Sequence, residues 1–320
     1  MSVIYEPTST CLSEVSTKAH FIERDCPICE SKKSNLEVES SVIGDTLSFA
    51  KLKESWFGFF KDKVFFSYFR CENCNALYNK KFFNEETLKI LYSSNPDNTD
   101  GLDVNMLRLT QRKYAKFLAD HAALKGNYFE LGPDLGVLSS EIAKMGDVEH
   151  FWFFEPNGEV HDMLRQNMKG SSVSISNEMA GFSSVPDASI DIAVLVHVLD
   201  HLIEPRKIME QIYKKLKVGG KILIVTHDES SFLARWLRKK WPAFCLQHPH
   251  LFNIKTTKNF LEIIGLKVIK TDKAYNNFPF FYLLRHLFFA LGLRIPVPKL
   301  NKPVLSLKLG NIITIAEKSR

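Results

Sequence analysis

Long hydrophobic runs are missing from this sequence. No segment reaches the ~18 uninterrupted apolar residues that a transmembrane helix needs, and the nearest, residues 278–293, is interrupted by Arg285 and His286. The first residues, MSVIYEPTSTCLSEV, have neither a basic start nor an apolar stretch, so the pattern of a secretory signal is also missing. We therefore expect a cytoplasmic protein without a membrane-spanning segment.

Cysteine is scarce, and neither sign of charge dominates. Six cysteines in 320 residues exclude a disulfide-dense secreted domain, and a content of 45% hydrophobic and 24% charged residues excludes a disordered tail or a collagen-like repeat. The net charge of +6 would help a phosphate-bearing partner to approach. A dense basic stripe is absent, which argues against a nucleic-acid partner. The length predicts about two domains.

The pattern along the chain divides it into three parts. Residues 1–92 hold four paired cysteines and many aromatic residues, and we expect a small metal-binding domain there. Residues 93–124 begin with a polar, turn-rich stretch, which we interpret as a linker followed by a leading helix. Residues 125–320 form the second domain, with an insertion at about 228–255.

Strands and helices alternate in the second domain. Apolar runs suited to strands are found at residues 127–131, 150–155, 172–176, 191–196, 221–226, 266–273 and 311–317. Helical patterns lie between most of them, and a Lys-Val-Gly-Gly turn is expected at 217–220. This rhythm predicts an α/β fold with a Rossmann-like, doubly wound and mostly parallel sheet.

The most informative stretch is Glu-Leu-Gly-Pro-Asp-Leu-Gly at residues 130–136, between the first strand and a helix. Glycines there let the backbone turn tightly beside a ligand, which binds at the carboxyl ends of such strands. Glu155 ends the next strand, 19 residues after Gly136, and its carboxylate can accept hydrogen bonds from a ribose diol. A dinucleotide is disfavoured because Asp134 occupies the second glycine position and Val137 follows Gly136.

Several motifs together resemble the class I S-adenosylmethionine-dependent methyltransferases, from about residue 107 to the C-terminus. ELGPDLG is similar to their first motif, usually D/E-x-G-x-G-x-G, and FFEPN at residues 153–157 is similar to their acidic motif on the second strand. SIDIAVLVHVLDHL, followed by LKVGGKILI, is similar to their fourth strand, its helix and the turn before the fifth strand. The departure is Asp134 in place of the middle glycine, and Asp tolerates a left-handed backbone better than most residues.

The resemblance implies a seven-stranded sheet with an antiparallel last strand and S-adenosylmethionine as the cofactor. It assigns the methionine part of the cofactor to the glycine turn, the ribose hydroxyls to Glu155 and adenine recognition to Glu178. His197 ends the fourth strand, where the family places residues beside the sulfonium. The expected cofactor-binding residues are Glu130, Leu131, Gly132, Pro133, Asp134, Gly136, Glu155, Pro156, Glu178 and His197.

Two C-x₂-C pairs lie in the N-terminal part of the chain. Cys26 pairs with Cys29, Cys71 pairs with Cys74, and 41 residues separate the two pairs. Two such pairs supply the four thiolates of a tetrahedral structural zinc site, which leaves no open position for catalysis. Two redox dithiols, or a chance spacing, are the alternatives.

The second cysteine pair continues as RCENCNALYNKKFFNEETLKILYSS, residues 70–94, which is similar to a bacterial subset of these methyltransferases. The subset includes sugar C-methyltransferases that act on nucleotide-linked deoxysugars and relatives in surface-polysaccharide clusters. Asn75 replaces the glycine that usually follows the second cysteine. The resemblance therefore implies a small-molecule acceptor, such as a nucleotide-linked sugar or a polysaccharide precursor.

An acidic acceptor position needs a general base. In the sugar C-methyltransferases a Glu-His pair stands in the insertion after the fifth strand, where His250 keeps the His and Pro249 replaces the Glu. His250 is therefore the expected base, with the alternative that it packs or hydrogen-bonds at the base of the insertion. The other candidates for a catalytic role are His248, His197 and Tyr92, the last by its match to a substrate-side tyrosine.

Other functions stay open at this point. Some RNA methyltransferases also join a zinc site to this fold, but their four ligands lie close together, and a catalytically silent cofactor-binding module is a further alternative because Asp134 alters the turn. Residues 278–293 and the basic stretch 235–240 could contact a membrane surface and a lipid-linked substrate, although packing of a helix on the sheet explains the same pattern. The oligomeric state is not predicted.

Overall fold

A computed structural model of the chain describes residues 20–40, 47–56, 64–93, 104–290, 293, 295–298 and 300–319. Residues 94–103, most of the predicted linker, lie outside the described residues. The helices are α1 (Phe49–Trp56), α2 (Glu85–Ser93), α3 (Val104–Ala119), α4 (Val137–Met145), α5 (His161–Asn167), α6 (Pro205–Lys215), α7 (Phe232–Leu237), α8 (Ile254–Ile264) and α9 (Phe280–Ala290), with short 3₁₀ turns η2 (Gly158–Val160), η3 (Leu199–His201) and η4 (Arg238–Lys240).

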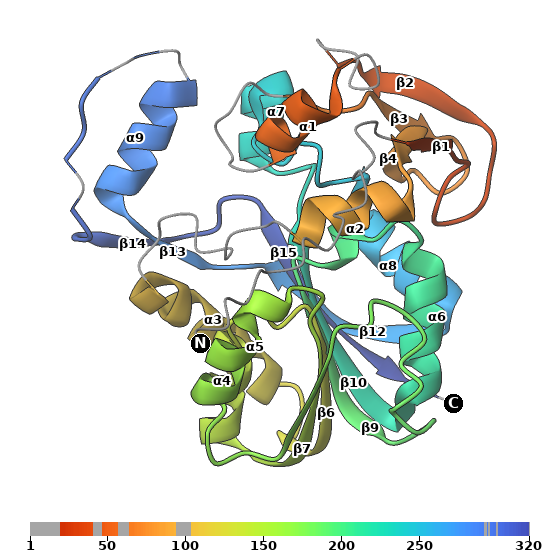
Figure 1. Ribbon diagram of the computed structural model, residues 1–320, viewed down its shortest axis with the longest axis vertical. Helices are drawn as coiled ribbons and strands as arrows, with labels where there is room; N and C mark the ends of the chain where they lie inside the picture. The colour runs from red at the N-terminus through yellow and green to blue at the C-terminus, as the bar shows by residue number, and fades with distance from the viewer. Residues whose placement is uncertain are drawn as a thin grey trace, which may run out of the picture.

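The strands are β1 (Phe21–Glu23), β2 (Ser34–Val38), β3 (Tyr68–Cys71), β4 (Leu77–Asn79), β5 (Lys81–Phe83), β6 (Lys125–Leu131), β7 (Asp147–Phe154), β8 (Val173–Ser176), β9 (Ile190–Val196), β10 (Leu216–His227), β11 (His250–Leu251), β12 (Leu266–Lys273), β13 (Asn276–Pro279), β14 (Val304–Leu307) and β15 (Asn311–Lys318). Seven of them form a sheet in the order β12-β15-β10-β9-β6-β7-β8 (Figure 1). Only β15 runs antiparallel to its neighbours β10 and β12. The predicted α/β sheet with an antiparallel last strand is therefore confirmed.

Helices cover both faces of this sheet (Figure 1). Along β9, Ile192 and Val194 pack into a core with α3, α4 and α5, whereas Ala193 and Leu195 pack into a core with α6 and α8. Side chains of a strand alternate between faces, so a strand that is buried on both must be apolar throughout. The continuous apolar run at 191–196 follows from this position.

A smaller four-stranded antiparallel sheet, β11-β4-β3-β2, lies beyond one end of the large sheet (Figure 1). Its edge strand β11 comes from the insertion that follows β10, and it pairs His250 with Tyr78. The N-terminal part of the chain and the insertion therefore fold together, although about 170 residues separate them in the sequence.

Two local expectations are wrong. The turn predicted at 217–220 belongs to β10, whose pairing with β9 shifts between Leu216 and Lys221, so the glycines make an irregular strand rather than a turn. Residues 278–293 do not form one helix, because β13 continues to Pro279 before α9 begins. Among the described residues, no helix is both long enough and apolar enough to cross a membrane.

Candidate functional site

The turn after β6 contains three residues with a left-handed backbone. Gly132, Asp134 and Gly136 have φ angles of 67°, 51° and 68°. A Cβ at Gly132 would lie 2.6 Å from Val198 Cγ2, and a Cβ at Gly136 would lie 2.4 Å from Leu164 Cδ1. Glycine is therefore required at both positions, whereas Asp134 adopts a conformation that Asp accepts at modest cost.

Glu155, directly after β7, holds this turn in place. Its Oε2 accepts the backbone N–H of Asp134 at 2.9 Å, and its Oε1 accepts the N–H of Asn157 at 2.9 Å. Burial raises the pKa of this carboxyl, and the two N–H donors oppose the rise. Each oxygen has a second lone pair, so the carboxylate can still accept hydrogen bonds from a ligand hydroxyl.

Glu130 is buried at the end of β6, with 2% of its surface exposed. Its Oε2 accepts hydrogen bonds from the Tyr128 hydroxyl at 2.8 Å and from the Ser139 hydroxyl. Burial raises the pKa of Glu130 to about 7, although both hydroxyl donors favour the charged form. The second oxygen, Oε1, receives neither of these bonds.

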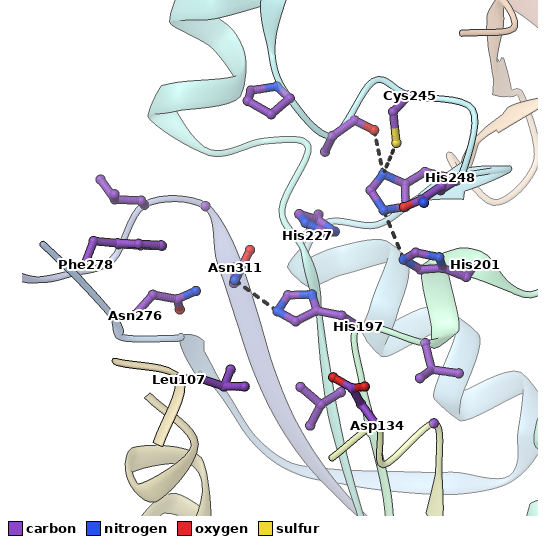
Figure 2. A pocket seen from close by; sticks show the side chains of 18 of the residues that line it. Leu107, Asp134, His197, His201, His227, Cys245, His248, Asn276, Phe278 and Asn311 are labelled. Atoms are coloured by element: carbon purple, nitrogen blue, oxygen red, sulfur yellow. Dashed lines mark hydrogen bonds between the residues drawn. The ribbon is translucent and has the colours of Figure 1, made fainter. Parts of the chain in front are cut away.

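A cavity of about 1010 Å³ lies beside the glycine turn, at the carboxyl ends of the strands (Figure 2). The insertion after β10, helices α7 and α9 and the strands β13 and β14 contribute further parts of its lining, together with residues of α1, α2 and α3. Of the predicted site residues, those that line the cavity are Tyr92, Glu130, Leu131, Gly132, Pro133, Asp134, Glu155, Pro156, His197 and His248. Gly136, Glu178 and His250 are not among the lining residues, and Glu178 is exposed next to Met179, which does line the cavity.

A buried aspartate and a histidine form one hydrogen-bonded pair at this cavity. Asp200 of η3 has no exposed surface, and its Oδ2 accepts the Nδ1–H of His227 at 2.5 Å. Burial opposes the ionisation of Asp200, but the surrounding histidines, His227 first, hold its pKa well below the usual range. Burial lowers the pKa of His227 while Asp200 opposes the change. His227 is therefore neutral at pH 7, with the proton on Nδ1 and the lone pair on Nε2.

A second chain of hydrogen bonds runs from His248 through His201, as Figure 2 shows, and on to Tyr92. His248 Nδ1 lies 2.7 Å from the Ala243 carbonyl oxygen and 3.3 Å from Cys245 Sγ, and its Nε2 lies 3.2 Å from His201 Nε2. His201 Nδ1 in turn lies 3.2 Å from the Tyr92 hydroxyl. The chain connects the insertion, η3 and α2 across the cavity.

The pKa values along this chain of hydrogen bonds indicate which of its two histidines carries the extra proton. Burial alone would lower the pKa of His248, but Cys245, Asp200 and the Ala243 carbonyl raise it to about 9. Burial, followed by the nearby His248, lowers the pKa of His201 to about 3. A charged His248 then donates to Ala243 and to His201, and neutral His201 donates its Nδ1–H to Tyr92. This assignment gives each ring N–H of His248 and His201 an acceptor and balances the buried charge of Asp200.

His197 follows β9 and lies between the histidine cluster and the glycine turn (Figure 2). Its φ angle is 53°, a rare conformation for a non-glycine residue that often marks functional sites. Its Nε2 lies 3.2 Å from Asn311 Nδ2, and burial lowers its pKa to about 3. Neutral His197 therefore accepts a hydrogen bond from Asn311.

His250 occupies a different place from the one that a base needs. Its side chain is 1% exposed, its Nε2 lies 2.8 Å from the Leu199 carbonyl oxygen, and it is not among the cavity-lining residues. Burial lowers its pKa to about 3. The position fits the alternative that His250 hydrogen-bonds at the base of the insertion, where its side chain supports η3, the turn that contains Asp200.

The histidine that the geometry favours as a base, His227, is not among the residues predicted from the sequence, although its place at the carboxyl end of the fifth strand is a usable signal. Asp200 and His201 are not among the predicted residues either. No sequence pattern brings the three together, since His227 follows η3 by 26 residues.

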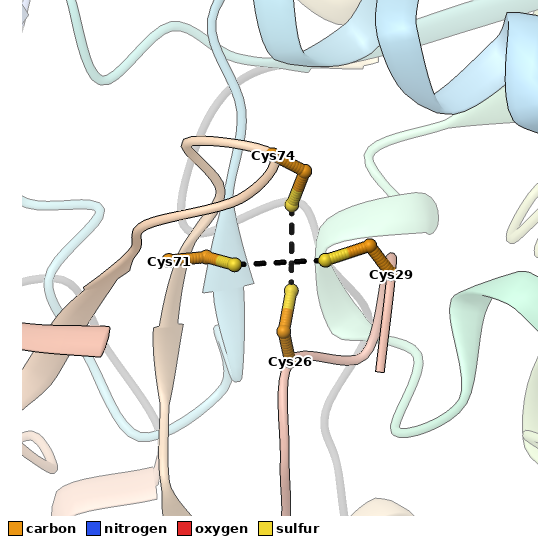
Figure 3. Close-up of side chains that lie close together, drawn as sticks. All are labelled: Cys26, Cys29, Cys71 and Cys74. Atoms are coloured by element: carbon orange, nitrogen blue, oxygen red, sulfur yellow. Dashed lines mark hydrogen bonds between the residues drawn. The ribbon is translucent and has the colours of Figure 1, made fainter. Parts of the chain in front are cut away.

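The four cysteine thiols of the N-terminal part converge on one point (Figure 3). Cys26 Sγ lies 3.5 Å from Cys74 Sγ, Cys29 Sγ lies 3.6 Å from Cys71 Sγ, and all four sulfurs lie within 4.8 Å of one another. Tetrahedral zinc with Zn–S bonds of ~2.3 Å implies sulfur–sulfur separations of about 3.8 Å. The donor set and its spacing therefore fit zinc.

His197, Asp200 and His227 also have potential ligand atoms within 4.8 Å of one another. The carboxylate of Asp200 is already bound to the Nδ1–H of His227 at 2.5 Å. We interpret this group as a hydrogen-bonded pair beside His197, because the contact has the length and partners of a charge-assisted hydrogen bond.

Solved structures of other proteins share the fold. A chain from a complex between the Haloferax volcanii Trm112 methyltransferase activator and a putative methyltransferase is similar, at 15% identity and a TM-score of 0.50, with 71% of this chain and 100% of that chain covered. The N-methyltransferase NodS from Bradyrhizobium japonicum, solved with S-adenosyl-L-homocysteine, is similar at 14% identity and a TM-score of 0.46, with 73% and 97% covered. At these identities the likeness concerns the fold alone.

A search of curated protein sequences found no match to this chain. A family model described as a methyltransferase domain matches residues 105–271, which is more than half of the chain. This range contains the glycine turn, Glu155 and the whole of η3. The chain therefore belongs to the methyltransferase-domain family and is an S-adenosylmethionine-dependent methyltransferase.

Proposed function

We propose that the protein methylates a small-molecule acceptor whose reacting atom must lose a proton, with His227 as the general base. One observation carries this proposal: the hydrogen-bonded pair of Asp200 and His227 opens onto the same cavity as the glycine turn. His248 supplies a positive charge beside this pair, since its ring centroid lies 4.6 Å from that of His227.

Asp200 determines which nitrogen of His227 is free. Because Nδ1–H donates to Asp200, the lone pair is on Nε2, to which the described part of the chain gives no hydrogen-bond partner. Nε2 can therefore take a proton from the acceptor, and Asp200 then stabilises the imidazolium that forms, as in other His-Asp pairs. The charged His248 stabilises negative charge that develops on the acceptor.

The cofactor is held by the residues around the glycine turn. Glu155 would bind the ribose hydroxyls, and Glu130 and Gly132 would border the methionine part. The bound cofactor supplies an electrophilic methyl group, and its sulfur keeps the electrons of the broken bond. His197 lies between this turn and the histidines, so it borders the space where donor and acceptor meet.

The acceptor class that we propose is a nucleotide-linked sugar or a precursor of a surface polysaccharide, as the cysteine-containing motif implies. An RNA acceptor receives little support, because Lys240 is the one Lys or Arg among the lining residues that the structure describes. RNA-binding clefts usually offer several cations to the phosphates.

We also propose that residues 1–92 form a zinc-binding domain. Cys26, Cys29, Cys71 and Cys74 would hold Zn²⁺ as four thiolates. A site with four protein ligands stabilises the fold and leaves no position for a substrate. The redox alternative needs a dithiol pair open to partners, whereas three of these four cysteines are buried.

Calorimetric titration with S-adenosylmethionine and S-adenosylhomocysteine tests the cofactor site. We expect micromolar binding that Glu155→Ala abolishes and that the matched change Glu159→Ala, at an exposed residue of the same loop, leaves intact. Equal affinity of the two variants would contradict the role of Glu155.

Release of S-adenosylhomocysteine from S-adenosylmethionine tests the transfer. The protein is incubated with nucleotide-sugar and lipid fractions of bacterial cells, and His227→Gln should bind the cofactor normally but form at least 100-fold less product, given the usual contribution of a general base. Cofactor binding without product in any fraction would favour the silent module.

A further inference from the structure

The cavity extends well beyond what the cofactor and a small polar acceptor need. Its volume of about 1010 Å³ lies at the upper end for ligand pockets. The lining from α7, α9 and β14 is mostly apolar, apart from Tyr282 and His286, and includes Leu233, Trp236, Leu237, Leu284, Leu287 and Leu305. Contact of this wall with a hydrocarbon chain would be far more favourable in free energy than its contact with water.

The charges of the cavity lining also favour an apolar ligand in this part of the cavity. Lys240 is the single Lys or Arg among the described lining residues, and it lies at the end of η4 beside the apolar wall, whereas the charged His248 lies in the histidine cluster. The diphosphate of a soluble nucleotide sugar is usually met by Arg side chains or by the N-terminus of a helix. An apolar chain fits this part of the cavity better than a nucleotide.

Helix α7 turns an apolar face outward at the edge of the cavity. Phe232 and Trp236, four residues apart and hence on one face, are 74% and 52% exposed. Trp236 also lines the cavity, so this face is continuous with the apolar wall. Exposed aromatic residues beside a pocket mark a contact surface, and Trp in particular prefers the boundary between lipid and water.

Basic residues surround this face. Arg235, Arg238 and Lys239 are exposed, and none of the three forms an ion pair with any residue that the structure describes. A short apolar face beside several cations matches the surface of an anionic bilayer, where each Lys or Arg contributes about 1 kcal/mol. The charge therefore selects an anionic membrane over a neutral apolar partner.

Helix α9 supplies the second apolar element. Its residues Phe280 and Leu287 are 39% and 38% exposed and line the cavity, and its sequence FFYLLRHLFFA is interrupted only by Arg285 and His286. Among the described elements it packs mainly against β13. A helix that is apolar all round is normally covered by a core or by lipid. Figure 1 shows α9 and α7 at the same end of the molecule.

We propose that the acceptor is amphipathic: a polar head that reaches the histidines is joined to a long apolar chain along the α7 and α9 wall, and the protein takes it from an anionic membrane surface. The substrate part of this proposal rests on the proposed function, since the polar head is the group that His227 deprotonates. A lipid-linked precursor of a polysaccharide has this chemistry.

Vesicle binding tests the surface. The full-length protein should cosediment with vesicles of phosphatidylcholine and phosphatidylglycerol at 7:3 and not with phosphatidylcholine alone. The triple variant Arg235→Gln, Arg238→Gln, Lys239→Gln should bind roughly 100-fold more weakly. The matched control changes Lys125, Lys169 and Lys267, exposed lysines near the amino ends of the strands, to Gln and should bind as the unchanged protein does.

An equal loss of vesicle binding in both triple variants would overturn the proposed membrane-binding surface, because net charge alone would then explain the binding. Phe232→Ser separates the apolar contribution and should weaken binding about tenfold. The proposed surface would also be overturned if Phe232→Ser left vesicle binding unchanged and the two triple variants bound vesicles equally well.

A chain-binding probe tests the cavity wall. The fluorescent fatty acid cis-parinaric acid should bind at micromolar concentration, and Leu284→Glu should weaken this binding at least tenfold, whereas Leu109→Glu, at an exposed leucine of α3, should not. Equal probe binding by Leu284→Glu and Leu109→Glu would overturn the apolar-chain site. Calorimetry with S-adenosylmethionine checks that each variant is folded. If the unchanged protein bound vesicles but not S-adenosylmethionine, the proposed function would be rejected and the membrane-binding surface would not.

Discussion

At the scale of single residues, the unusual feature of the cofactor turn is Asp134. Its φ of 51° is left-handed, and its backbone N–H still donates to Glu155 at 2.9 Å. The replacement of the usual glycine therefore preserves the shape of the turn, because the contact that holds it uses the backbone and not the side chain.

Two substitutions at Asp134 check this explanation. Asp134→Gly should keep S-adenosylmethionine affinity, since glycine adopts the same φ without strain, and Asp134→Val should lower it about tenfold, because a β-branched residue is strained at positive φ. Calorimetric titration measures both. Weaker binding by Asp134→Gly would mean that the Asp side chain itself contributes to the site.

Glu130 should make stability depend on pH in an unusual direction. Its pKa is raised to about 7 in the native state from 4.5, so the native state holds a proton between pH 4.5 and 7 that the unfolded state has released. The free energy of unfolding therefore falls as pH rises through this window, by about 3 kcal/mol in total. Urea unfolding at pH 5 and pH 7.5 measures the difference, and Glu130→Gln should remove most of it. A profile unchanged by Glu130→Gln would contradict the raised pKa.

The histidine assignment is open to direct measurement. Histidine NMR titration should show His248 with a pKa of about 9 and His201 neutral throughout the physiological range. Asp200→Asn should lower the pKa of His248, because the negative charge that stabilises the imidazolium is gone. Asp147→Asn, at an exposed residue at the start of β7, serves as the control. An unchanged His248 titration in Asp200→Asn would contradict the charge balance proposed for the cluster.

At the scale of elements, one arginine joins three segments that are distant in the sequence. Arg24, directly after β1, donates to the carbonyl oxygens of Asn79 at 2.8 Å, Ile203 at 3.0 Å and Pro249. These carbonyls belong to β4, to the segment after η3 and to the insertion. The guanidinium thereby connects the N-terminal part to both segments that carry the histidine cluster.

Loss of this arginine should be costly. Arg24→Ala removes the guanidinium that donates to three carbonyls, of which that of Pro249 keeps the N–H of Asn79, and should lower the free energy of unfolding by about 3 kcal/mol. Arg24→Lys should recover only part of it, since one ammonium cannot match the planar fork. Denaturant unfolding measures the change, with Arg165→Ala, which breaks an exposed pair with Asp162, as a control within about 0.5 kcal/mol. Equal effects of the two alanine variants would refute this role.

At the scale of the whole molecule, the small sheet connects the cysteine site to the cavity that we propose as catalytic. Cys71 ends β3, β3 pairs with β4, and β4 pairs with β11 of the insertion. The Tyr68 hydroxyl of β3 donates to the His248 carbonyl oxygen at 2.7 Å. We therefore expect a change at the cysteines to alter the position of His248 through these strands.

Metal removal should show this connection. Chelation of zinc, or Cys71→Ser, should lower the melting temperature by several degrees and shift the NMR signals of His248, while the signals of the sheet residues around Ala193 change little. Restored zinc should reverse the effect of chelation. Protein that contains no zinc when purified, or a cluster whose signals are unaffected by its removal, would contradict the proposal.

Much of the fold was determined by local sequence features. The continuous apolar run at 191–196 predicts a strand buried on both faces, the glycines at 132 and 136 predict the turn, and the two C-x₂-C pairs predict a shared metal site. The strand and the turn each depend on a few neighbouring residues, and each cysteine pair is itself a local motif, so these features can be recognised in the sequence alone.

The histidine cluster that we propose as catalytic was decided by the tertiary structure. His227 ends β10, Asp200 lies in η3 and His248 comes from the insertion, and only the parallel sheet and the pairing of β11 with β4 bring their side chains together. His250 was predicted as the base because it matches the His of the Glu-His pair in the sugar C-methyltransferases, yet its Nε2 lies 2.8 Å from the Leu199 carbonyl oxygen and it is not among the cavity-lining residues. The identity of a base depends on burial, charge and free lone pairs, and these are set by contacts between segments far apart in the chain.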